Sequence, residues 1–188
     1  MDELSGQGRQ PASARLAEEM LAYADALFNL AHHLTGNDHD GEDLVQETFV
    51  RAVAASRSFQ GGNLKAWLFR ILRNTFIDQY RRQKHNPVTF GFDESDEAPQ
   101  RGLLVDELDL DQSQRLLGAE IESALQLLPP RSREVILLDV EGLTEVEVAG
   151  VLGCAVGTVK SRLARARSVL RQKLADYGKT EGGDGGAP

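Results

Sequence analysis

The segment LTEVEVAGVLGCAVGTVKSRLARARSVL, residues 143–170, decides how the C-terminal part of the chain folds. It opens with a capping box, because Thr144 is followed three residues later by Glu147 and each side chain can bond the backbone N–H of the other. Ala149 lets two helices cross closely, and Gly153 permits a tight turn after the first of them. The segment therefore predicts a helix-turn-helix, with helices over 144–152 and about 157–174.

The second helix of this motif has two different faces. Apolar residues recur on one face at helical spacings: Val159, Leu163, Ala166 and Leu170. Small residues and a cation occupy the opposite face: Ser161, Ala164, Arg165 and Ser168. Small central side chains allow a helix to enter the major groove of DNA deeply. Lys160 and Arg165 are suited to reading guanine edges, whereas Arg162 and Arg167 are suited to holding phosphates.

A second basic helix is predicted over 64–84. Its polar stripe falls within about 100° of arc and contains Arg70, Arg73, Asn74, Ile77, Arg81 and Lys84. Asn74, at the centre, donates and accepts hydrogen bonds at once, which suits the edge of an unpaired base better than a phosphate. Trp67 lies near the edge of the stripe, where its ring can stack on an unstacked base. A role in core packing explains a tryptophan at this position at least as well.

Charge is strongly segregated along a chain whose formal net charge is −8. Every charged residue over 91–111 is acidic except Arg101, whereas the charged residues over 155–174 are all basic. DNA responds to positive potential within a Debye length of about 8–10 Å, so these local basic patches matter more than the total. The overall negative charge therefore does not exclude a nucleic-acid partner.

The pattern of helices and breaks predicts an all-α protein with two small helical domains joined by an acidic flexible linker, the C-terminal domain containing the helix-turn-helix. A single helix is expected over 15–34, and a further one beginning at 40–43. The predicted segments are a disordered N-terminus over 1–13, a first domain over 14–86, a linker over 87–113, a second domain over 114–176 and a disordered tail over 177–188.

Several classes of protein are disfavoured by composition. The single cysteine, Cys154, excludes an internal disulfide framework and favours a cytoplasmic location. No apolar run approaches the roughly 20 residues of a membrane helix, so no membrane insertion is expected. His32 and His33 are adjacent and point in different directions on a helix, and 38–40 lacks the spacing of a calcium loop. We therefore expect no metal, no cofactor, no small-molecule substrate and no enzymatic activity.

Three segments together resemble the extracytoplasmic-function (ECF) sigma factors of bacterial RNA polymerase. Residues 43–49, DLVQETF, resemble the segment with which these factors grip the clamp helices of the polymerase β′ subunit. Residues 67–74, WLFRILRN, resemble the helix that binds the −10 element and holds a flipped base. Residues 156–167, VGTVKSRLARAR, resemble the helix that reads the −35 element. The resemblance covers about 23–82 and 120–174.

The resemblance implies a DNA-melting initiation factor that binds core RNA polymerase, including its β′ clamp helices and β subunit, and promoter DNA. The implied polymerase contacts are Asp43, Leu44, Gln46, Glu47 and Arg51. The implied −10 contacts are Asn63, Lys65, Trp67, Arg70, Arg73, Asn74, Arg81 and Lys84. The implied −35 contacts are Thr144, Thr158, Lys160, Ser161, Arg162, Arg165 and Arg167. Control by an anti-sigma factor in a stress response is also implied.

A helix-turn-helix repressor that acts without polymerase binding is the main alternative. It would normally carry a dimerisation or ligand domain and bind a palindrome. That alternative leaves the acidic segment over 43–49 and the basic helix over 64–84 without a role. Affinity for core polymerase distinguishes the two hypotheses.

Overall fold

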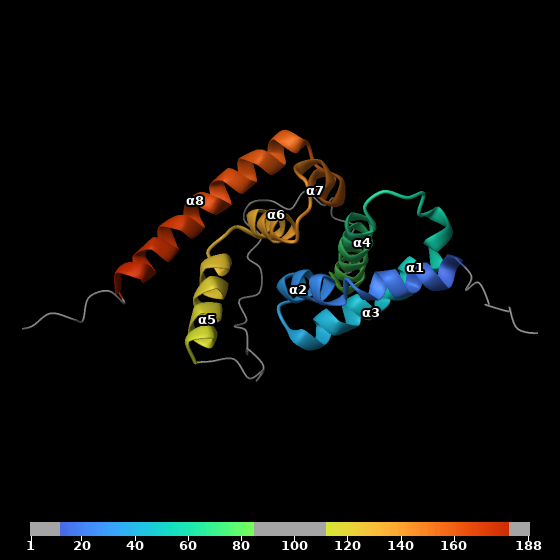
Figure 1. Ribbon diagram of the computed structural model, residues 1–188, viewed down its shortest axis with the longest axis horizontal. Coiled ribbons are helices and arrows are strands. Elements are labelled where there is room, and N and C mark those ends of the chain that lie inside the picture. Colours follow the sequence, from blue (N-terminus) through green and yellow to red (C-terminus); the bar gives the residue numbers. More distant parts are fainter. Residues whose placement is uncertain (1–11, 85–111, 181–188) are drawn as a thin grey trace, which may run out of the picture.

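The computed structural model describes residues 12–84 and 112–180, and all regular structure within these ranges is helical (Figure 1). The first range holds α1 (Ala12–Leu21), α2 (Ala24–Thr35), α3 (Asp38–Ala54), the short 3-10 helix η1 (Ser56–Ser58) and α4 (Leu64–Lys84). The second range holds α5 (Gln112–Gln126), α6 (Pro130–Val140), α7 (Glu145–Leu152) and α8 (Val156–Thr180). The all-α class with two helical domains is confirmed. Most of the acidic linker predicted over 87–113 lies outside the described residues, as do 1–11 and 181–188.

Local sequence signals account for most helix ends. The bounds of α4 agree with the predicted helix over 64–84. Gly36 adopts a left-handed conformation with φ of 80° and donates its N–H to the His32 carbonyl, which ends α2. Asn37 then accepts a hydrogen bond from the Asp40 N–H at 2.9 Å and begins α3. Pro130 stands at the first position of α6, where a missing N–H costs nothing.

Two predicted helices differ from those observed. The single helix expected over 15–34 is broken into α1 and α2 at Tyr23, whose N–H bonds the Met20 carbonyl in a turn. Neither glycine nor proline stands at this break. The two helices differ in part of their packing, since α1 contacts η1 whereas α2 contacts α6. In addition, α8 continues to Thr180, so residues 177–180 of the predicted disordered tail are helical.

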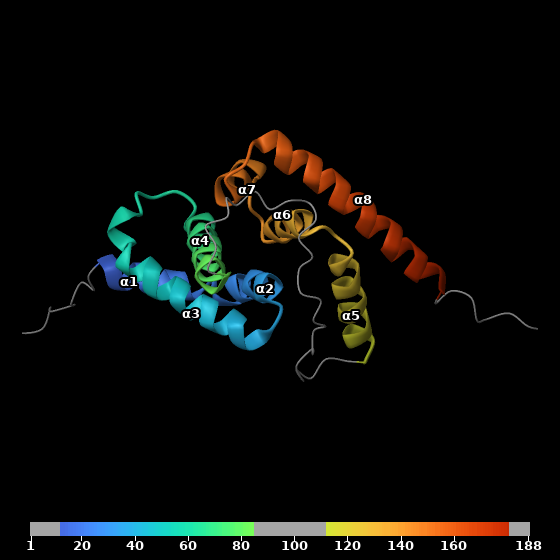
Figure 2. The same ribbon diagram turned by 180° about the vertical axis from the view of Figure 1, so that it is seen from behind.

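One continuous hydrophobic core extends through both groups of helices. In the N-terminal group, α4 supplies the fully buried side chains of Leu68, Phe69 and Leu72. In the C-terminal group, Leu138 of α6 and Val159 of α8 are fully buried. The two groups meet where α4 packs against α7, which lies beside it in both views (Figures 1 and 2). The helix with the basic stripe is therefore also the helix that joins the two domains.

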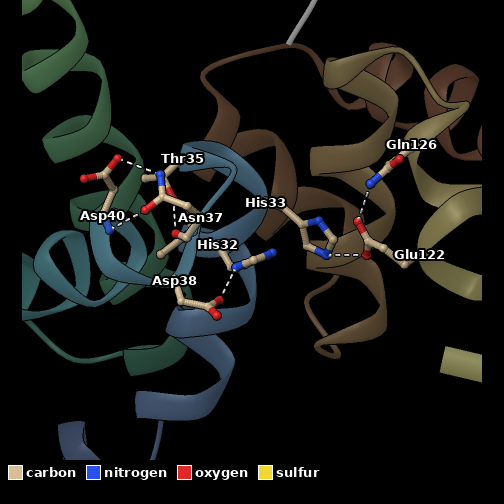
Figure 3. A network of polar contacts seen from close by, with 9 residues as sticks. His32, His33, Thr35, Asn37, Asp38, Asp40, Glu122 and Gln126 are labelled. Carbon is tan, nitrogen blue, oxygen red and sulfur yellow. Dashed lines mark hydrogen bonds and ion pairs between the residues drawn. The ribbon is translucent and has the colours of Figure 1, made fainter. Parts of the chain in front are cut away.

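A second contact between the groups involves histidine. Figure 3 shows His33 of α2 turned toward Glu122 of α5, with its Nε2 atom 3.7 Å from a carboxylate oxygen. The neighbouring His32 points elsewhere, and its Nδ1 atom lies 2.6 Å from the Asp38 carboxylate. Burial is the main cause that lowers the pKa of His33 from 6.5 to about 4, and the nearby His32 and Arg133 lower it further. His33 is therefore neutral at pH 7.

The depressed pKa of His33 predicts a loss of stability in mild acid. Because the folded pKa lies below the unfolded value, the unfolded chain binds a proton first, and stability falls as pH drops below 6.5 toward about 4. We expect the unfolding free energy to decrease by about 1–2 kcal/mol between about pH 7.5 and pH 5, measured by urea denaturation.

The variant His33→Gln isolates the histidine contribution to this loss. Burial raises the pKa of Glu122, and this carboxyl therefore increases the unfolding free energy as pH falls. Parent and variant are compared at each pH so that its effect cancels. A loss that is just as large in His33→Gln would show that His33 is not its source.

Candidate nucleic-acid interface

The helix-turn-helix predicted from residues 143–170 is present in α7 and α8. The Thr144 N–H donates to the Glu147 carboxylate at 2.8 Å, and the Glu147 N–H donates to the Thr144 hydroxyl oxygen at 3.3 Å. This completes the capping box at the start of α7. Gly153 ends α7 with a left-handed φ of 63° and donates its N–H to the Ala149 carbonyl. The predicted cap and turn are confirmed.

The two faces predicted for α8 are also observed. Val159, Leu163 and Ala166 are buried, and Leu170 packs at the edge of the core. The outward residues are exposed: Lys160, Ser161, Ala164, Arg165 and Ser168. Their exposure leaves a surface of small residues and cations available along the N-terminal half of α8. This half carries the predicted −35 contacts other than Thr144.

Several predicted contact residues around that surface already have protein partners. Arg167 donates to the Asp139 carboxylate of α6 at 2.7 Å. Lys160 lies 3.6 Å from Glu145, and their side chains are 63% and 43% exposed. The Nη1 atom of Arg162 is buried, while the residue as a whole is half-buried. The Thr144 hydroxyl is engaged by Glu147, which gives it a structural role in the cap.

The outer side of α4 carries the stripe that was predicted to meet an unpaired base. Asn74, Arg70 and Arg81 are exposed, and the side chain of Lys84 lies outside the described part of the chain. Trp67 is half-buried and its ring lies 5.2 Å from that of Phe59, centroid to centroid. Trp67 therefore contributes to packing while part of it stays accessible.

Three of the predicted −10 residues contact glutamates of the C-terminal domain. Asn63 donates to Glu147 at 2.7 Å. The Lys65 ammonium lies 2.6 Å from the Glu141 carboxylate and 2.7 Å from the Glu141 carbonyl oxygen. Arg73 lies 3.4 Å from Glu134. Glutamates distant in sequence therefore cover most of the Lys65 and Arg73 side chains, whereas Asn63 stays exposed.

The surface predicted to bind polymerase lies on α3 and needs one correction. Asp43 and Gln46 are exposed, and Glu47 accepts a hydrogen bond from Arg51 at 2.7 Å. Arg51 also donates to Asp78 of α4 at 2.9 Å, so it mainly ties two helices together, and these bonds raise its pKa above the usual value. Leu44 is fully buried in the core and cannot make a surface contact.

Two exposed valines on α3 were not among the predicted contact residues. Val50 is 64% exposed and Val53 is 50% exposed. They follow Gln46 by four and seven residues, so helical geometry places them on the same side as Gln46. That spacing was a signal available in the sequence. The α3 surface thus combines acidic, amide and apolar groups, as protein-binding surfaces often do.

The described residues form neither a cluster of metal-binding side chains nor a membrane-spanning helix. Within residues 12–84 and 112–180, no group of three or more histidine, cysteine, aspartate or glutamate side chains is arranged to hold a metal ion. Cys154 is a free, half-buried thiol. None of the described helices combines the length and the apolar character that crossing a membrane requires.

These features define a two-domain helical protein of the sigma-70 class. Residues 20–86 match the family described as Sigma-70 region 2, and residues 118–170 match Sigma-70, region 4. The ECF RNA polymerase sigma factor EcfG of Rhodopseudomonas palustris is 39% identical over 166 residues, which cover 87% of this chain and 87% of that protein. SigE of Mycolicibacterium smegmatis is 37% identical over 171 residues, or 90% of this chain and 65% of the relative. The chain belongs to the family of ECF RNA polymerase sigma factors.

Solved structures agree with this assignment. The sigma factor RpoE of Bartonella quintana, crystallised with the anti-sigma factor NepR, matches with a TM-score of 0.62 and 34% identity over 86% of this chain and 97% of that chain. CnrH in complex with the cytosolic domain of CnrY matches with a TM-score of 0.59 and 29% identity, covering 87% and 95%. The fold and the sequence therefore indicate the same family.

The geometry of the turn between α7 and α8 predicts different effects on stability for two glycine substitutions. Gly153→Ala forces a side chain into a left-handed conformation and should lower the unfolding free energy by about 1–2 kcal/mol. Gly157→Ala lies in the first turn of α8, where a Cβ meets no atom within 4 Å, and should be neutral or stabilising by up to about 1 kcal/mol. Urea denaturation of both variants checks this, and equal effects would contradict the assigned turn.

Proposed function

We propose that this chain binds core RNA polymerase, directs it to −10 and −35 promoter elements and promotes DNA melting, under the control of an anti-sigma factor. The observation that carries the proposal is the coexistence of two separate basic helices with exposed outer residues. These are α8, within a complete helix-turn-helix, and α4, with Asn74 and Arg70 exposed. Membership of the ECF sigma family supports it.

For the −35 element, we assign base reading to the exposed centre of α8. Lys160 and Arg165 are long cations beside small Ser161, so they can reach guanine edges in the major groove. Each bidentate contact of this kind contributes about 1–3 kcal/mol of discrimination. Thr158, Arg162 and Arg167 flank this centre and are assigned to phosphates, where Arg167 would exchange its Asp139 partner for DNA.

For the −10 element, we assign base capture to Asn74. Its carboxamide lies exposed beside Arg70 and matches an unpaired base edge. Extruding a base costs a few kcal/mol, which contacts in the binding site partly offset. Trp67, Arg73, Arg81 and Lys84 extend the site along α4, and Asn63 and Lys65 extend it at the helix start.

For core polymerase, we assign the exposed side of α3, with Asp43, Gln46 and Glu47 contacting the β′ clamp helices. Val50 and Val53 add an apolar patch beside them, and removal of such a patch from water is a common source of binding free energy. Contacts with the β subunit complete the complex. We also infer that 14–86 and 114–176 act as separate functional domains in the cytoplasm and that the chain catalyses no reaction.

Control by an anti-sigma factor is inferred from the relatives. RpoE of Bartonella quintana and CnrH are both known in complexes, with the anti-sigma factor NepR and with the cytosolic domain of CnrY. This chain resembles each over most of its length. The repressor hypothesis is not favoured, because it assigns no role to the exposed surface of α3.

Polymerase binding is tested by replacing two polar residues of α3. The double variant Gln46→Ala/Glu47→Ala should bind sigma-free core polymerase at least about tenfold more weakly, because central interface residues often contribute 2 kcal/mol or more. Gel filtration and fluorescence anisotropy measure the loss. The matched control Asp25→Ala/Asn29→Ala removes the same kinds of group from exposed positions on α2 and should bind normally. A folded α3 variant that binds like the parent would refute this assignment.

Base capture is tested in the holoenzyme. The parent holoenzyme first selects a single-stranded DNA from a randomised pool, called here the selected strand. Asn74→Ala should weaken binding of the selected strand by about 5- to 150-fold, corresponding to about 1–3 kcal/mol. Core polymerase binding should not change, since Asn74 lies on α4. Unchanged affinity for the selected strand would remove Asn74 from the −10 site.

A further inference from the structure

A polar network within the N-terminal domain joins α3 to α4 through one arginine. The Nε atom of Arg51 donates to the Glu47 carboxylate at 2.7 Å, and its Nη1 atom donates to the Asp78 carboxylate of α4 at 2.9 Å. Glu47 stands four residues before Arg51 on α3, whereas Asp78 follows it by 27 residues. A single guanidinium therefore holds carboxylates from two helices.

The arginine is the least exposed member of this network. The side chain of Arg51 is 29% exposed, that of Glu47 is 42% exposed and that of Asp78 is 46% exposed. Charge-assisted hydrogen bonds to a planar guanidinium are directional. An arginine that is bonded to two carboxylates and lies mostly out of water therefore has few other orientations.

The partner on α4 makes the network rigid. A Glu–Arg pair four residues apart on one helix is weak by itself and leaves both side chains free to change rotamer. Asp78 belongs to a helix whose Leu72 and Thr75 are fully buried, so its own position is fixed by the core. Asp78 thus holds Arg51 in place, and Arg51 in turn holds the Glu47 carboxylate.

The charges of the three groups suit the interface that Glu47 is assigned to. A carboxylate at a binding surface attracts a basic partner, and one arginine alone beside it would cancel that attraction. Here two carboxylates surround one guanidinium, so one negative charge stays in excess. Glu47 is therefore held by an arginine without losing its attraction for positive groups.

We propose that Arg51 and Asp78 are positioning residues for polymerase binding, which hold Glu47 in the orientation that polymerase meets and do not contact polymerase themselves. This inference rests on the proposed function of α3. Ordering a long side chain at an interface costs binding free energy, and a side chain that is already held avoids most of that cost. Asp78 thus supports polymerase binding from the helix that is assigned to DNA.

The test breaks the network at each end and measures affinity of the full chain for sigma-free core polymerase by fluorescence anisotropy. Arg51→Gln should weaken binding about two- to tenfold, the cost of ordering one long side chain. Asp78→Ala should weaken it by a smaller factor, because Glu47 keeps its bond to a looser Arg51. The first change makes the chain more negative and the second makes it less negative, so a loss in both cannot come from net charge. The matched control Asp25→Ala removes an exposed aspartate from α2 and should bind normally.

A double-mutant cycle with Glu47→Ala separates positioning from direct contact. If Arg51 and Asp78 act through Glu47, neither Arg51→Gln nor Asp78→Ala weakens binding further once the Glu47 side chain is absent. Losses of equal size in both backgrounds would show that Arg51 contacts polymerase itself or only supports the packing of α3 on α4. Either result overturns the inference.

A folded Arg51→Gln variant that binds as tightly as the parent, or more tightly, also overturns the inference, because Glu47 would then need no support. Urea denaturation checks that each variant is folded, and Asp78→Ala tests the same network without a change on α3 if Arg51→Gln is unstable. Failure of the proposed function gives a different result. In that case Gln46→Ala/Glu47→Ala binds like the parent, whereas failure of the positioning role alone leaves that double variant weak.

Discussion

The central constraint in this structure is that α4 buries one side completely and therefore presents its other side in a fixed direction. Leu68, Phe69 and Leu72 pack into the N-terminal core and prevent rotation of the helix about its axis. Arg70, Asn74 and Arg81 on the opposite side are then exposed as one stripe. Such a row of positive groups attracts any suitably placed acid, whether a phosphate of DNA or a carboxylate of the same chain.

The helix-turn-helix and the domain contact share residues, so they are physically linked. Glu147 closes the capping box of α7 and also accepts a hydrogen bond from Asn63 of α4. Hydrogen bonds from Thr144 and Asn63 lower the pKa of this carboxyl, which favours its charged form. The side of α8 with Lys160 and Arg165 is turned away from its own core, and both residues are exposed. The contact between the domains therefore involves α4 and leaves Lys160 and Arg165 of α8 exposed.

Periodicity and capping predicted the parts of the fold that depend on neighbours three or four residues apart. The bounds of α4, the cap and turn of α7, and the buried face of α8 are all confirmed. The break at Tyr23 was missed because no residue there disfavours a helix. Leu44 was assigned to a binding surface from a motif alone, and motif similarity does not separate the residues that contact a partner from those that hold the helix.

The sequence by itself determined the all-α class, the helix-turn-helix and the two basic helices, because local hydrogen bonds and helical spacing specify each of these within about two turns. Only the tertiary structure decided which charged groups are free. Lys65 and Glu141 are separated by 76 residues, and nothing local to either predicts that they meet at 2.6 Å. Their pairing depends on how α4, α6 and α7 pack, and that arrangement arises from the shared core of both domains.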